Sequence, residues 1–341
     1  MNIFTSLLPV LWAMAVLSGS PAKAAEWQGT IVTANERDNT LSFITWPQKV
    51  QTRIPVPIAP HNVQFTRDGK VLLAVGAASG AKGHEQHGAG GILVIIDGVS
   101  PKAEPMATVS IVGHPAHVVA DRDGRFAYVT DATGNAVIVV DLAGKAAVAT
   151  IPVGTYPHGL RMSSDEREIY VANMRGDSVS VLDVAGRKEV ARIRVGKRPV
   201  QVGFTPDGKF AFASLNAENA VAVIDTAKRT LVAKKPVGRG PVQVYASADS
   251  AAILVANQGS EKRPDNRISI VPIRGAAKTR HVETGRGAHG LAVSEDGSLV
   301  AVTNTYANTL TVIDGVSIKV LDALEVGAAP NGVTVSAAPA R

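Results

Sequence analysis

Histidine placement is the feature of this sequence that most directly suggests chemistry. The chain has 341 residues, eight histidines and no cysteine. His61, His158 and His289 each lie seven residues before an aspartate that begins a turn, and His117 lies six residues before one. Imidazole nitrogens are common metal ligands, and without thiolates they suit Cu(II), Zn or Fe. These four histidines are therefore the predicted ligands of a divalent transition metal.

Two further histidines, His84 and His87, lie in the glycine-rich segment "GAKGHEQHGAG". "HEQH" is one residue short of the H-E-x-x-H pattern of zinc proteases, and its glycine-rich surroundings favour a flexible loop over the helix that such a site requires. The pair is a second source of metal ligands only if this loop folds over the site. Glu85 would then be the nearest carboxylate base.

The histidines belong to a repeat that spans most of the chain. Pro115, Pro157, Pro199 and Pro241 are spaced 42 residues apart, and Pro60 and Pro330 mark further copies. Each unit contains four short alternating segments, such as "HGLRMSS", "IYVAN", "SVSVLD" and "KEVARIRVG", with tight Asp-containing turns between them. A period near 40 with strand-type alternation is typical of β-propeller blades.

The segments "YVTD", "YVAN" and "VTN", followed by "SVSVLD" or "TLTVID" and by "IPVG" or "LEVG", resemble the YVTN-type β-propeller repeat family. A more distant resemblance joins the chain to cytochrome d1-like and lactonase-like propellers. The resemblance implies a fold and leaves the function open, because binding proteins, surface proteins and enzymes share this architecture.

The predicted fold is an all-β, seven-bladed propeller of four-stranded blades. Six complete units begin at residues 60, 115, 157, 199, 241 and 288. Three N-terminal strands and one C-terminal strand remain, and together they would close a seventh blade, which removes the open sheet edge. Residues 25–341 are predicted to form this single domain.

The first strand of each blade lies innermost in a propeller, so the four histidines are expected around one mouth of the central channel. Other polar residues share this mouth, and we expect them to contribute to ligand binding. They are Asn331, Gln201 and Gln243 in the ring, with Arg198, Arg239 and Arg286 in the adjoining loops. The structural alternative is that each histidine only satisfies the backbone of its turn.

Two classes of function are compatible with such a mouth. In the first, a non-catalytic accessory protein holds a metal ion, a cofactor, a protein partner or a small anionic ligand, which the arginines would attract. In the second, the same histidines hold a metal that catalyses hydrolysis, elimination or oxidation. A d1-type haem site is a weaker third interpretation, since the sequence carries no further signature of it. The binding protein is the favoured interpretation.

Residues 1–24 are predicted to be a cleaved export signal. An apolar stretch precedes "SPAKA", whose small residues end at Ala24, and this places the mature chain in the periplasm or outside the cell. About 16 apolar residues are too few for a stable membrane span. The formal net charge of +6 comes without a basic run, and aromatic residues make up 4% of the chain, so nucleic acid is not a favoured partner.

Overall fold

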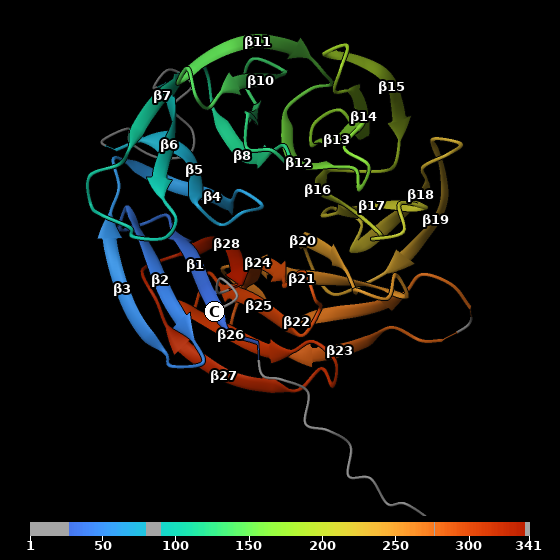
Figure 1. The fold of residues 1–341 in the computed structure, drawn as a ribbon. Helices are drawn as coiled ribbons and strands as arrows, with labels where there is room; N and C mark the ends of the chain where they lie inside the picture. The colour runs from blue at the N-terminus through green and yellow to red at the C-terminus, as the bar shows by residue number, and fades with distance from the viewer. Residues whose placement is uncertain (1–26, 80–89, 276, 338–341) are drawn as a thin grey trace, which may run out of the picture.

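Seven four-stranded antiparallel sheets form a ring around a central channel (Figure 1). The computed structural model describes residues 27–79, 90–275 and 277–337, and within these residues the regular structure consists of 28 β-strands. No helix in these ranges is long and apolar enough to cross a bilayer. The predicted seven-bladed propeller is confirmed.

Each blade runs from an innermost to an outermost strand, and the strands are given in that order. Blade 1 consists of β4 (Ile58–Phe65), β5 (Val71–Ala78), β6 (Gly91–Asp97) and β7 (Ala107–Ile111). Blade 2 consists of β8 (Pro115–Ala120), β9 (Phe126–Asp131), β10 (Ala136–Asp141) and β11 (Ala146–Pro152). Blade 3 consists of β12 (Pro157–Met162), β13 (Glu168–Asn173), β14 (Ser178–Asp183) and β15 (Lys188–Arg194).

The remaining blades follow the same order. Blades 4 to 7 are β16 (Pro199–Phe204), β17 (Phe210–Leu215), β18 (Ala220–Asp225) and β19 (Thr230–Pro236); β20 (Pro241–Ala246), β21 (Ala252–Ser260), β22 (Arg263–Pro272) and β23 (Arg280–Glu283); β24 (Ala288–Val293), β25 (Leu299–Asn304), β26 (Thr309–Asp314) and β27 (Val320–Glu325); and β28 (Pro330–Ala337), β1 (Gly29–Asn35), β2 (Thr40–Trp46) and β3 (Val50–Pro55).

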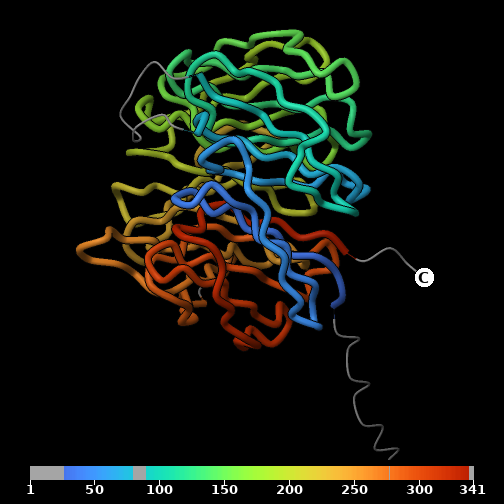
Figure 2. Tube along the Cα trace, turned by 90° about the vertical axis from the view of Figure 1, so that its left-hand side faces the viewer, coloured from blue at the N-terminus to red at the C-terminus, as the bar shows by residue number. Residues whose placement is uncertain are grey.

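Strands from both ends of the chain close blade 7, as predicted. The inner strand β28 pairs antiparallel with β1, with Gly29 opposite Ala337 and Thr33 opposite Val333. The first and last described residues therefore lie side by side (Figure 2). This pairing covers the edge of β1, which would otherwise present unpaired N–H and C=O groups.

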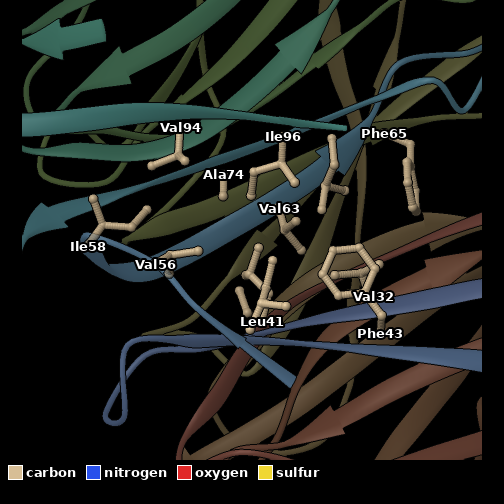
Figure 3. Close-up of a cluster of buried hydrophobic side chains, with 13 residues drawn as sticks. Val32, Leu41, Phe43, Val56, Ile58, Val63, Phe65, Ala74, Val94 and Ile96 are labelled. Carbon is tan, nitrogen blue, oxygen red and sulfur yellow. The ribbon is translucent and has the colours of Figure 1, made fainter. Parts of the chain in front are cut away.

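Apolar contacts between neighbouring blades make the core. One cluster joins blade 7 to blade 1, where Val32, Leu41 and Phe43 pack against Val63 and Phe65 (Figure 3). Middle strands such as β14 are buried along almost their whole length, whereas outermost strands such as β15 alternate between exposed residues and partly or fully buried ones. Each blade thus packs against its two neighbours, one on each face, and this packing fixes the positions of the inner strands.

Hydroxyl–aspartate turns join the two innermost strands at the end of the propeller away from the histidines. In blade 3, Ser163 Oγ donates to Asp165 Oδ1 at 2.7 Å, and in blade 6 Ser294 Oγ donates to Asp296 Oδ1 at 2.6 Å. The carboxylates also accept backbone N–H groups, for example that of Arg167. These aspartates therefore serve the turns, as Asx-type residues commonly do.

Candidate metal centre

The starts of the inner strands bring three of the predicted histidines together. His61 (β4), His117 (β8) and His158 (β12) each offer a ring nitrogen, and these atoms lie within 4.8 Å of one another. The closest pair is His61 Nε2 and His158 Nε2, at 3.3 Å. His289 (β24) lies beside this group, with its ring centroid 6.3 Å from that of His61.

A β-bulge explains how His117 joins the group although it lies one residue later in its strand. Alternation alone would turn neighbouring side chains to opposite faces. The pairing of β8 with β9 is irregular between Pro115 and Val118, and the pairing of β12 with β13 is irregular between Pro157 and Leu160. A bulge re-aims side chains, so residues at both positions reach the channel.

A carboxylate and an amide from blade 7 hold His61. Glu36 Oε1 lies 3.5 Å from His61 Nδ1, and both side chains are largely buried, with 14% and 17% exposed respectively. Asn331 donates through Nδ2 to Glu36, and the same nitrogen lies 3.3 Å from His61 Nδ1. The carboxylate favours a proton on Nδ1, which leaves the lone pair of Nε2 facing His158, whereas a hydrogen bond from the Asn331 amide to Nδ1 places the proton on Nε2, between His61 and His158.

Backbone carbonyls orient the other two strand-start histidines. His158 Nδ1 lies 3.1 Å from the carbonyl oxygen of Val200, and His289 Nδ1 lies 3.3 Å from that of Asn331. A carbonyl only accepts, so Nδ1 carries the proton in both rings and each Nε2 is an unprotonated nitrogen. The next blade thus sets the tautomer of both rings.

His117 has the opposite arrangement. The amide nitrogen of Gln201 lies 3.2 Å from His117 Nδ1 and also donates to Gln243 Oε1, while Gln201 Oε1 accepts the N–H of Val202. Because the amide nitrogen is a donor, His117 Nδ1 accepts and its Nε2 carries the proton. Gln201 and Gln243, predicted as ligand-binding residues, are buried here and serve the histidine.

Burial keeps the imidazoles of His117, His158 and His289 neutral. Burial, followed by the charge of a protonated His158, holds the pKa of His117 well below the usual range for histidine. Burial, followed by His61, lowers the pKa of His158 to about 3 and that of His289 to about 4. A neutral imidazole is the form that ligates a metal, so these rings do not have to lose a net proton to bind one at neutral pH.

Acid should destabilise the metal-free protein through these buried histidines. Histidine in the unfolded chain titrates near 6.5, whereas His158 and His289 titrate near 3 and 4 in the folded chain. Between pH 6.5 and 4 the unfolded state therefore binds more protons than the folded state. As the pH is lowered through this range, the free energy of unfolding should decrease by about 1.4 kcal/mol per pH unit for each such histidine.

Urea unfolding of resin-stripped protein across this range measures that slope. His289→Asn places the residue of the equivalent blade 7 position, Asn331, in blade 6, and it should flatten the slope by about 1.4 kcal/mol per pH unit. The matched control is His281→Asn, because His281 is exposed on β23. An unchanged slope in His289→Asn would show that His289 does not cause the acid sensitivity.

The remaining polar residues predicted at the mouth, Asn331 and the three loop arginines, make different kinds of contact. Asn331 is part of the histidine network. Arg239 donates through its side chain to the carbonyl of Pro264, whereas Arg198 uses its backbone, whose N–H donates to Asp177 and whose carbonyl accepts the N–H of Asn216. The backbone carbonyl of Arg286 accepts the N–H of Tyr306 in the neighbouring loop. His84 and His87 lie outside the described residues.

Glu36 is the site residue that sequence reasoning missed. It directly follows Asn35, the last residue of β1, in the loop to β2. Asn35 uses its own amide to bond Thr40 and Ser42, so it stabilises the turn, while the next residue reaches the histidines. A signal was present in the repeat, because Glu36 lies in a loop between the second and third strands of its blade, at the end of the blade where the inner strands begin.

Comparison with known proteins identifies the fold family. The profile of the YNCE-like beta-propeller family matches residues 160–340, which is more than half of the chain. The chain belongs to this family. This agrees with the repeat-based assignment to YVTN-type propellers and with the lactonase-like resemblance. The search of curated proteins gave no match.

Solved structures share the architecture at low sequence identity. The periplasmic gluconolactonase of Pseudomonas aeruginosa is 19% identical with a TM-score of 0.71, over 92% of this chain and all of that chain (100%). A putative 6-phosphogluconolactonase of Bacteroides uniformis is 15% identical with a TM-score of 0.73, over 91% and 100%. The hydrazine synthase of Kuenenia stuttgartiensis is 19% identical with a TM-score of 0.70, over 83% and 96%. These likenesses concern the fold alone.

Proposed function

We propose that this protein binds one divalent transition metal ion at the histidine mouth, through His61, His117 and His158. The 3.3 Å between His61 Nε2 and His158 Nε2 is the observation that carries the proposal. Two imidazole nitrogens at about 2.0–2.1 Å from a tetrahedral Zn²⁺ are roughly 3.3–3.4 Å apart. Two imidazole nitrogens at this distance need a proton or a metal ion between them, because two facing lone pairs repel each other.

The donor set defines the class of metal. Neutral nitrogen ligands suit Zn²⁺, Cu²⁺ or Fe²⁺ and disfavour Ca²⁺ and Mg²⁺, which prefer oxygen. Glu36 beside His61 Nδ1 matches the carboxylate–histidine–metal arrangement, in which the carboxylate fixes the tautomer and makes the imidazole a stronger ligand. With three protein ligands, a fourth position stays open for water, a substrate or His289.

Of the three proposed ligands, His117 requires the largest rearrangement before it can bind the metal. Its Nε2 carries a proton while Gln201 donates to its Nδ1. Ligation through Nε2 requires the proton to move to Nδ1, and the Gln201 amide must then turn its oxygen toward the ring. His61 and His158 would therefore bind first, with His117 completing the site.

The biological role we favour is that of an exported binding or accessory protein. The signal pattern of residues 1–24 supports action in the periplasm or outside the cell. Its partner would be a protein or a small anionic ligand that approaches the metal past the rim arginines.

Metal-dependent hydrolysis is the second candidate, and Glu36 is the observation that favours it. The sequence offered no carboxylate base within the ring, whereas the structure places this one 3.5 Å from His61. Two of the neighbours carry lactonase names, so gluconolactone is a reasonable first substrate. Hydrolysis that depends on added metal and is lost in Glu36→Gln would favour the enzyme. Metal binding without such hydrolysis would favour the binding protein.

Glu36→Gln should weaken zinc binding by about 10–100-fold, the usual cost of losing an outer-shell partner of a ligating histidine. The substitution keeps the size of the side chain and removes the charge that orients the Nδ1 proton of His61. Calorimetric titration measures the effect, and Glu325→Gln, at an exposed residue of β27, is the matched control. Equal affinity in Glu36→Gln and wild type would remove Glu36 from the site.

The proposed function itself is tested by elemental analysis. Protein purified from the periplasm without added metal, or stripped and then titrated with Zn²⁺, should bind one equivalent. Failure to bind Zn²⁺, Cu²⁺ or Fe²⁺ at neutral pH would return the histidines to a structural role.

A further inference from the structure

A second polar site lies at the opposite end of the channel, among the turns that join the two innermost strands. Two cavities of about 290 Å³ each meet there. We call them together the lower chamber. The two cavities share part of their lining, which consists of Arg161, Tyr245, Val293, Ser294 and Glu295. The chamber thus has two lobes with a shared wall.

Arg161 brings a charge to a channel position that is otherwise uncharged. It is the fourth residue after Pro157, and the equivalent position of the other six blades holds no ionisable acid or base apart from a tyrosine. Those residues are Gln64, Val119, Gly203, Tyr245, Ala292 and Thr334. Neither the blade repeat nor the histidine mouth at the other end of the channel requires a cation here.

The guanidinium of Arg161 is held in place by an aromatic ring. It donates through Nη2 to the hydroxyl of Tyr245 at 2.9 Å and lies 5.0 Å from the centre of that ring. Its other hydrogen bond goes to the carbonyl of Leu160, at 3.3 Å. Arginine has five N–H donors, so this arrangement fixes the group and leaves donors for a ligand.

Two carboxylates and a second arginine also line the chamber, and all three have partners of their own. Glu295 pairs with Arg67 at 3.1 Å, and Asp68 accepts from Thr66 and pairs with Lys70. Across the described parts of the chain, no carboxylate lies within ion-pair distance of Arg161. A partly buried arginine without a counter-ion favours an anionic ligand, because guanidinium and carboxylate match in bidentate geometry.

The walls indicate what the rest of the ligand is. Phe204 and Val244 line one lobe, and Trp27 and Phe65 line the other. Apolar walls with a few convergent polar groups are typical of small-molecule sites. We propose that the lower chamber binds a small organic carboxylate, whose anionic group pairs with Arg161 and whose apolar body fills one lobe. Of the two arginines that line the chamber, Arg67 is paired with Glu295, and one remaining cation favours this monoanion over a phosphate dianion.

Benzoate and its neutral isostere benzamide are the probes, titrated by ligand-detected NMR into full-length protein stripped on a chelating resin. Stripping prevents the carboxylate from binding a metal at the histidine mouth. Benzoate should bind at millimolar concentration or below, and benzamide should bind about tenfold more weakly or worse, because a charged hydrogen-bonded pair is lost.

Arg161→Gln should reduce benzoate affinity about tenfold or more, with Arg161→Lys between this variant and wild type. Arg167→Gln is the matched control, since Arg167 is 85% exposed on a neighbouring turn. His61→Ala should bind benzoate as wild type does, which separates this site from the metal centre. Equal binding of benzoate and benzamide, unchanged affinity in Arg161→Gln, or no binding of benzoate at all would overturn the proposal.

A diffraction experiment covers the case in which Arg161→Gln does not fold. Crystals of the wild type soaked in 4-bromobenzoate should show an anomalous bromine peak in one lobe of the lower chamber. A bromine peak only elsewhere, or none, would contradict the assignment.

Discussion

Replacing His61 and His158 together with alanine should abolish zinc binding at the histidine mouth. These two side chains supply the pair of nitrogens 3.3 Å apart, and His117 alone remains in the ligand group. The loss should far exceed the roughly 10–100-fold that removal of an outer-shell partner costs. Calorimetric titration of stripped protein with Zn²⁺ at neutral pH measures it.

The fold should survive this double substitution. Ala116, Val200 and Val242 occupy the equivalent position in blades 2, 4 and 5, so the repeat accepts apolar residues there. The control is His281→Ala, which removes an exposed histidine far along the chain on β23 and should leave zinc binding unchanged. If the double variant bound Zn²⁺ with wild-type affinity and stoichiometry, the metal would have to bind elsewhere.

Deleting residues 329–341 should cause the largest loss of stability. The deletion removes β28, which pairs with β1 along its length and brings Val333 and Val335 into a core cluster with Trp27 and Ile31. Blade 7 would lose its inner strand, and β1 would become an open edge. We expect mostly insoluble protein, or a thermal midpoint lower by well over 10 °C, since burial of even one large apolar side chain is worth about 1.5–3 kcal/mol.

A chain that ends at Ala337 is the matched control, because it keeps β28 whole. It should fold and melt like the full-length protein. A soluble deletion variant that melts at the wild-type temperature would contradict the role of β28 in closing the ring.

The repeat predicted the fold well because the same physical pattern recurs. Strand alternation, Asp-containing turns and a fixed spacing were enough to place seven blades, and the orphan strands at the two ends required closure of the seventh. Pro115, Pro157, Pro199, Pro241 and Pro330 all begin inner strands as expected. Inter-blade packing then follows, since middle strands apolar on both faces must be covered on both faces.

The site was less predictable because its details depend on contacts between blades. Sequence alone placed the histidines at one mouth, but a bulge decided that His117 joins His61. The pairing of Glu36 with His61 joins residues of different blades, and so does that of Gln201 with His117. Such pairs have no signature in a single sequence. The Arg161–Tyr245 contact was missed for the same reason, since it spans two blades across the channel.

X-ray absorption at the metal edge, combined with anomalous diffraction from zinc-loaded crystals, tests the central claim most directly. The metal centre predicts one anomalous peak between His61 and His158, with nitrogen ligands at about 2.0–2.1 Å and no sulfur ligand. His117 should lie within bonding distance of the same peak. A metal bound only at the protein surface, or coordinated mainly by oxygen, would contradict the assignment of these three histidines as a metal site.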